Sequence, residues 1–201
     1  AARWETMRWL PQGTFRVRTS ARARHLTVRA VPELQYASFP LQPRIPAQGD
    51  FNWDWLKANV LPSVNTVMFY PSPSAEAAIA EWDALGRKGI VECGMPGGAD
   101  LTAQSAFEAW YKTPGFQAPH FSGTICDEFS GRQWPGYPAW IGGMKLLMGA
   151  TKDSGRRFYG YCGGPGMFSR PECRALVQSV FDGGSYMAWE RYLHEMPTEA
   201  E

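Results

Sequence analysis

Short apolar runs and amphipathic segments alternate along the chain from residue 33 onward. Six runs carry apolar residues at neighbouring positions, as strands buried on both faces do. They span residues 33–38, 64–70, 89–93, 123–129, 157–162 and 185–190. Between most of them, apolar residues recur every three or four positions, which predicts helices near residues 53–61, 75–85, 101–110, 137–148 and 176–181. The pattern therefore predicts an α/β protein.

The spacing of the predicted strands favours a parallel sheet. Their centres follow one another at intervals of roughly 30 residues, the length of one strand–helix–strand unit. Repetition of this unit is typical of a (β/α)8 (TIM)-type barrel, which needs about 250 residues. The 201 residues hold about six such units. We therefore expect a truncated or incomplete barrel over residues 32–201, with an open doubly wound sheet as the alternative.

A different pattern precedes the first of these strands. Apolar and polar residues alternate around Phe15 and Val17, and again around Leu26 and Val28. A period of two indicates half-exposed strands. Residues 1–31 are therefore predicted to form an antiparallel β-hairpin, either as the end of an upstream β-domain or as a lid on the barrel-type domain.

Composition narrows the choice of partners. The 20 basic and 19 acidic side chains leave a net charge of +1, so neither nucleic acid nor a membrane is predicted as a partner. Arginines crowd the first 29 residues, and we interpret them as a solvated strand face, because a nucleic-acid surface would also need lysines and exposed aromatic residues. Nine Trp, eight Tyr and eleven Phe suit a ligand with flat apolar faces, such as a sugar ring. The oligomeric state is left open.

The sequence says little about the compartment. No apolar run approaches the roughly 18 residues that span a bilayer. The first residues, Ala1–Trp4, do not form a signal peptide. The compartment is left open, with secretion or a periplasmic location among the options.

The four cysteines do not form a zinc motif. Cys93, Cys126, Cys162 and Cys173 lie too far apart for a paired Cys-x2-Cys pattern, and no metal or other cofactor is predicted. Three of them end apolar runs, as buried thiols do. Cys162 and Cys173 flank one loop, where either a disulfide or two free thiols would fit.

Three predicted strands end in carboxylates, and parallel folds place their active sites at these strand ends. Glu92 ends the third strand, Asp127 and Glu128 end the fourth, and Glu190 ends the sixth. If Ile125 faces the helices, alternation turns Glu128 inward. The same alternation on the sixth strand turns Glu190 inward.

Two carboxylates that face each other across a cleft can hydrolyse a glycosidic bond. One donates a proton to the leaving oxygen, and the other attacks the sugar or activates water. We therefore predict a carbohydrate-active hydrolase with Glu128 and Glu190 as catalytic residues and Asp127 as the reserve. Strand-end and aromatic residues are predicted to bind the oligo- or polysaccharide substrate: Tyr70, Glu92, Trp134, Tyr137, Tyr161 and Trp189.

The acid pair that closes the run Gly123–Phe129, together with Trp189-Glu190 at the end of the sixth strand, resembles the (β/α)8 glycoside hydrolases. Several of these families place catalytic acids on the fourth strand and on the sixth or seventh. The resemblance implies that Glu128 or Asp127 is one catalytic partner and Glu190 the other. It departs from the Asn-Glu pair of one large clan, because Asp127 stands where the Asn would be.

Two other functions fit the same pattern. A non-catalytic barrel or truncated domain that binds carbohydrate or protein would need the aromatic surface without the acid pair. A metal-dependent sugar isomerase or lyase would use acids and a histidine, and Glu190 and His194 have the helical spacing to share a divalent ion.

Overall fold

The computed structural model describes residues 10–18, 25–40, 49, 51–130, 135–163 and 166–190. Strands and helices alternate along these residues, as the sequence predicts. In chain order they are β1 (Gln35–Phe39), α1 (Trp53–Asn59), the 3-10 helix η2 (Leu61–Ser63), β2 (Thr66–Phe69), α2 (Glu76–Ala84), β3 (Lys88–Cys93), α3 (Ala103–Tyr111), α4 (Pro114–Gln117), β4 (Gly123–Ser130), α5 (Tyr137–Thr151), β5 (Arg157–Gly163), α6 (Gly166–Ser169), α7 (Pro171–Asp182) and β6 (Tyr186–Glu190).

The six strands form one sheet in the order β1-β2-β3-β4-β5-β6. The pairs β1–β2, β3–β4, β4–β5 and β5–β6 are all parallel. This order follows the chain without reversal, as successive units of a (β/α) barrel do, whereas a doubly wound sheet reverses its order part-way. The predicted α/β class and parallel sheet are confirmed, and a truncated barrel fits this order. A complete eight-stranded barrel is not confirmed.

The predicted N-terminal hairpin is not confirmed either. Residues 13–18 and 25–31 form no strand, and the expected turn near residues 20–24 lies outside the described residues. Phe15, Val17 and Leu26 are exposed, and Val28 is 74% exposed. Alternation stabilises a strand only when its apolar face is covered, and an isolated two-stranded hairpin is marginal in water.

The chain divides into two compact units, residues 1–88 and 89–201. In the first unit, Trp53 of α1 packs between Phe39 of β1 and Trp82 of α2, with ring centroids 5.0 and 6.0 Å away. Trp82 donates its indole N–H to the carbonyl of Lys88 at 2.8 Å, and the guanidinium of Arg87 lies 4.8 Å from the Trp82 ring. These contacts join β1, α1 and α2 around an aromatic core.

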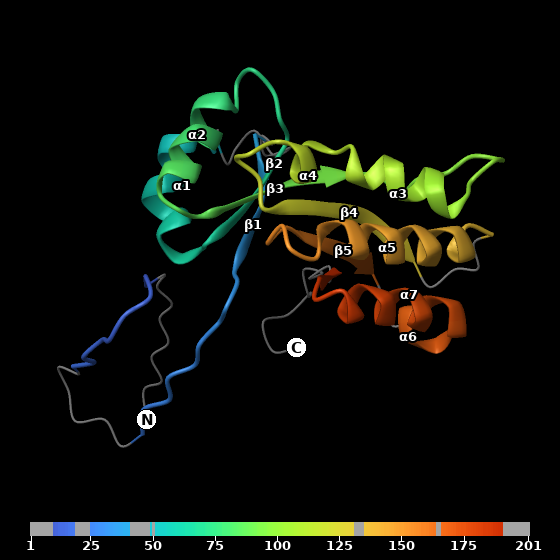
Figure 1. Ribbon diagram of the computed structural model, residues 1–201. Helices are drawn as coiled ribbons and strands as arrows, with labels where there is room; N and C mark the ends of the chain where they lie inside the picture. Colours follow the sequence, from blue (N-terminus) through green and yellow to red (C-terminus); the bar gives the residue numbers. More distant parts are fainter. Residues whose placement is uncertain are drawn as a thin grey trace, which may run out of the picture. The chain divides into compact units, whose positions relative to one another are not determined.

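In the second unit, α3, α5 and α7 lie side by side along β4 and β5 (Figure 1). Their buried residues form one core with residues of the strands. Cys126 and Phe129 of β4, and Phe158 and Cys162 of β5, belong to this core. We call this the helix face of the sheet, and the opposite face of β3–β6 the inner face.

Glycines allow α3 and α5 to approach closely. An added Cβ at Gly143 of α5 would lie 2.8 Å from the Cβ of Ala106 and 2.9 Å from the carbonyl oxygen of Ala103, both on α3. We expect Gly143→Ala to lower the free energy of unfolding by about 1–3 kcal/mol, as overpacking does. Denaturant titration measures the change.

Gly149 provides the matched control in the same helix. A Cβ at Gly149 would meet no atom within 4 Å, so Gly149→Ala should raise the free energy of unfolding by about 0.5–1 kcal/mol through helix propensity alone. Equal gains in both variants would contradict the close α3–α5 packing.

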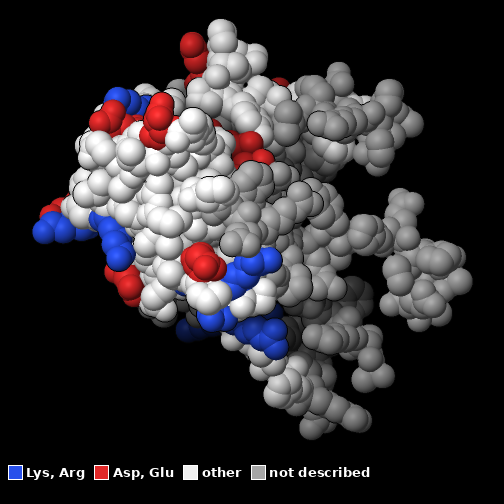
Figure 2. All heavy atoms as spheres, turned by 90° about the vertical axis from the view of Figure 1, so that its right-hand side faces the viewer, with Lys and Arg blue, Asp and Glu red and all other residues white. Residues whose placement is uncertain are grey.

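The surface carries mixed charge. On the face shown in Figure 2, acidic and basic side chains lie in small groups around uncharged surface. Among the helices in the described ranges, none is long and apolar enough to cross a membrane. The predicted absence of nucleic-acid and membrane partners stays a prediction.

Candidate functional site

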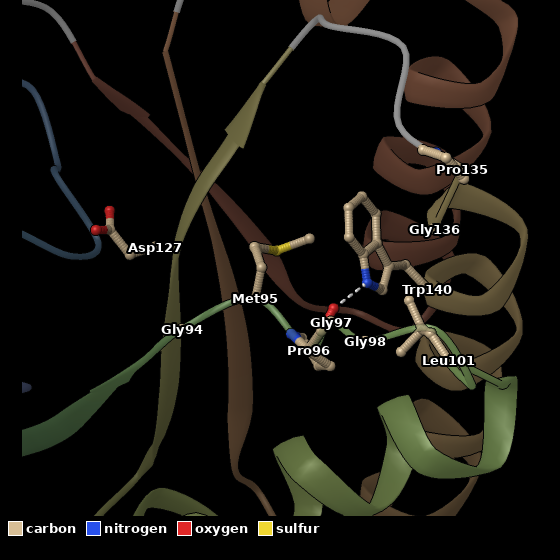
Figure 3. A pocket seen from close by; sticks show the side chains of 10 residues that line it. All are labelled: Gly94, Met95, Pro96, Gly97, Gly98, Leu101, Asp127, Pro135, Gly136 and Trp140. Carbon is tan, nitrogen blue, oxygen red and sulfur yellow. Dashed lines mark hydrogen bonds between the residues drawn. The ribbon is translucent and has the colours of Figure 1, made fainter.

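A pocket of about 540 Å³ lies in the second unit, where β3 and β4 end. The β3–α3 loop, the end of β4 and the start of α5 form its wall, and the lining residues are Gly94, Met95, Pro96, Gly97, Gly98, Leu101, Asp127, Pro135, Gly136 and Trp140. The indole N–H of Trp140 donates to the carbonyl of Pro96 at 2.9 Å (Figure 3). This bond ties α5 to the loop, and the side chains around it are apolar.

Asp127 is the acidic residue of this lining, yet its carboxylate does not point at the indole. Figure 3 shows the Asp127 side chain on one side of the β4 ribbon, with Met95 and Trp140 on the other. The pocket therefore lies on the helix face, and the Asp127 carboxylate is directed towards the inner face.

Alternation along β4 explains this orientation, because Cys126 packs into the helix-face core and the next residue, Asp127, turns to the opposite face. A bulge in β4 follows directly. Cys126 pairs with Gly160 and Phe129 pairs with Cys162, so two residues of β4 stand opposite the single residue Tyr161 of β5. Cys126 and Phe129, on either side of the bulge, both lie in the helix-face core. The prediction that Ile125 faces the helices and Cys126 faces inward is therefore wrong. Asp127 is the residue directed to the inner face.

The inner face collects acidic and aromatic residues at the carboxyl ends of three strands. Cys93 packs against the helix-face core, so alternation along β3 places Glu92 on the inner face. Tyr161 follows by the same argument from Cys162. Glu92, Asp127 and Tyr161 are each half-buried. Three predicted site residues are thus brought to one surface.

The two acids of this surface stand on neighbouring strands. Glu92 pairs with Ile125, two residues before Asp127. A strand separation of about 4.8 Å and a rise of about 3.3 Å per residue put the Cα atoms of Glu92 and Asp127 roughly 8 Å apart. Two carboxyl groups on such backbones can approach the separations of about 5–9.5 Å found in glycosidases.

A tyrosine pair extends the surface across β5 and β6. The rings of Tyr159 and Tyr186 stack with centroids 5.4 Å apart and an interplanar angle of 29°. Tyr159 is buried, while Tyr186 is 45% exposed. The Tyr186 ring therefore presents a flat aromatic surface on the same side of the sheet as Tyr161.

The remaining predicted site residues lie elsewhere. The side chains of Glu128 and Glu190, and the whole of Trp134, are outside the described residues, so the pairing of Glu128 with Glu190 stays a prediction. Tyr70 follows β2 in the first unit and is half-buried. Trp189 is 46% exposed and stacks on Phe168, with ring centroids 5.3 Å apart.

Tyr137 lies in the helix-face core and not in an aromatic wall. It is 2% exposed. Burial, and after it the hydrogen bond with the Cys173 thiol, raise the pKa of Tyr137 above its usual range. Its hydroxyl thus stays neutral and holds α5 to α7, a structural role.

All four cysteines lie in the described residues and are free thiols, so the optional Cys162–Cys173 disulfide is not formed. Burial, and after it the hydrogen bond with the Cys93 thiol, raise the pKa of Cys126 well above its usual value. The described residues contain no group of three or more His, Cys, Asp or Glu side chains that could hold a metal ion. His194 is outside these residues.

Comparison of the chain with protein-family models, with curated proteins and with solved structures finds no match. The resemblance to glycoside hydrolases therefore rests on the residues themselves.

Glu92 has a position that the sequence pattern did not reveal. It was expected to bind substrate, but its register places it on the strand next to Asp127, opposite Ile125. The order of the strands along the chain could have predicted that Glu92 lies near Asp127, because the third and fourth strands are neighbours wherever consecutive units pair.

Proposed function

We propose that the protein is a carbohydrate-active hydrolase whose inner face carries the reaction, with Asp127 and Glu92 as the two carboxylates. The observation that supports this most directly is the shared position of Asp127, Glu92 and Tyr161 on the inner face of three neighbouring strands. The bulge in β4 begins at Asp127, and bulges are over-represented next to active sites.

Each part of this surface has a role in the proposed reaction. One carboxyl group protonates the leaving glycosidic oxygen, and the other acts as nucleophile or activates a water molecule. The Tyr186 ring, stacked on Tyr159 and exposed, gives a sugar ring an apolar surface on which to rest. The Tyr161 hydroxyl, beside Asp127 in the register, offers a hydrogen bond to a substrate hydroxyl.

A non-catalytic saccharide-binding protein is the second candidate. The observation that favours it is a second exposed aromatic pair, Phe168 and Trp189, whose rings stack at an interplanar angle of 18°. Phe168 is 49% and Trp189 46% exposed. Stacked rings at the surface serve binding without any need for an acid pair.

A panel of plant and bacterial polysaccharides tests the proposal. The full chain is incubated with each polymer, and newly formed reducing ends are measured beside direct binding by isothermal titration calorimetry. We expect at least one polymer to be bound and cleaved. Binding without reducing ends would favour the second candidate, and neither binding nor cleavage would refute both.

A further inference from the structure

Three sulfur atoms meet where β3 ends beside the middle of β4. The Cys126 thiol lies 3.5 Å from the Met95 thioether sulfur and 3.4 Å from the carbonyl oxygen of Gly94. The same thiol is hydrogen-bonded to Cys93, its in-register partner on β3. Two thiols and a thioether thus come from two neighbouring strands and the loop that follows the first.

We propose that Cys93, Cys126 and Met95 form a binding site for a soft monovalent metal ion, Cu(I). Thiolate and thioether sulfur are the ligands that this ion prefers over nitrogen and oxygen. Zn²⁺ sites usually have four ligands from Cys, His and acidic residues, and Ca²⁺ and Mg²⁺ need oxygen. Two thiols and one thioether therefore favour Cu(I) over Zn²⁺, Ca²⁺ and Mg²⁺.

The cluster can be reached from solvent. Gly94 and Met95 line the pocket of about 540 Å³ described above, and Cys93 is half-buried, whereas Cys126 is fully buried. Met95 lines the pocket, and the Cys126 sulfur lies 3.5 Å from the Met95 sulfur.

The loop has room to adjust to an ion. Metal–sulfur bonds of about 2.3 Å place coordinating sulfur atoms roughly 3.8–4.0 Å apart, so Cys126 and Met95 need to separate by only a few tenths of an ångström. A Cβ added at Gly94, Gly97 or Gly98 would meet no atom within 4 Å. The backbone at these three glycines is therefore not crowded by neighbouring atoms.

Binding is an exchange of ions. Cu(I) forms bonds to the sulfur atoms, and each thiol that coordinates releases its proton to the buffer. No electron is transferred.

Anaerobic competition with a chromophoric Cu(I) chelator tests the site on the full chain. We expect the wild type to withdraw one equivalent of Cu(I), and Cys93→Ser and Cys126→Ser to weaken binding by about 100-fold or more, which is at least the loss that an outer-shell substitution causes. Met95→Leu conserves the volume of the side chain and should weaken binding about tenfold, the low end of that range.

Cys173→Ser is the matched control, because Cys173 is also a buried thiol of the helix-face core with a hydrogen-bonding neighbour. We expect it to bind Cu(I) like the wild type. Thermal melting of each variant reports its folding, and X-ray absorption of the loaded wild type should show sulfur ligands. A wild type that withdraws no Cu(I), unchanged binding in both cysteine variants, an unchanged Met95→Leu, or an equal loss in Cys173→Ser would each overturn the proposal.

Discussion

Asp127→Asn should lower the hydrolysis of the responsive polysaccharide by about 10²–10⁴-fold, the range that a positioned proton donor or acceptor contributes. The amide keeps the shape of the carboxylate but can neither accept the proton of a water molecule nor donate one to a leaving oxygen. Because the substrate still rests on the inner face, its affinity should change little. Initial rates and calorimetric affinities separate the two effects.

Glu92→Gln tests the other member of the proposed pair and should produce a loss of similar size. Asp153→Asn is the control, since its side chain is 88% exposed and follows α5, away from the carboxyl ends of the strands. Turnover that survives both inner-face substitutions would contradict the pair. A loss confined to Glu128→Gln and Glu190→Gln would instead support the pair expected from the sequence.

Gly123→Ala should lower the free energy of unfolding by roughly 3 kcal/mol or more, which combines backbone strain with overpacking. Gly123 begins β4 with φ +154°, and an added Cβ would collide with the carbonyl oxygen of Arg157 on β5 and lie 2.9 Å from its nitrogen. The obstacle is the backbone of the neighbouring strand, which cannot move aside as a flexible side chain does. Denaturant titration or thermal melting measures the loss.

Gly97→Ala is the control for this substitution. Gly97 lies in the β3–α3 loop, and a Cβ there would meet no atom within 4 Å. Its stability should stay within about 0.5 kcal/mol of the wild type. If Gly123→Ala were equally mild, the close approach of β4 and β5 at Gly123 would be contradicted.

The pattern of apolar residues was sufficient to predict the arrangement of strands and helices. Runs such as residues 64–70 and 123–129 are long enough and apolar enough to be buried on both faces, and the amphipathic segments between them have helical periodicity. The spacing of these runs also predicted the parallel pairing. The order of the elements and their parallel pairing depend on local sequence and on connection length, and both can be read from the sequence.

The pattern near Val17 and Val28 shows where local periodicity is insufficient. The same alternation that marks a strand occurs there, yet the described residues form no strand and their apolar side chains are exposed. A strand needs a partner for its hydrogen bonds and a covering for its apolar face. Neither requirement can be read from the periodicity of one segment.

The sequence by itself determined the α/β class, the parallel order and the gathering of acids at strand ends, because hydrophobic periodicity and short connections decide these. Only the tertiary structure decided which acids share a face. Cys126 packs into the helix-face core, which turns Asp127 towards the inner face, and a bulge then returns Phe129 to the core. The register of β3 against β4 then makes Glu92 its neighbour. A bulge arises from the pairing of two strands, and the alternation of apolar and polar residues along one strand does not reveal it.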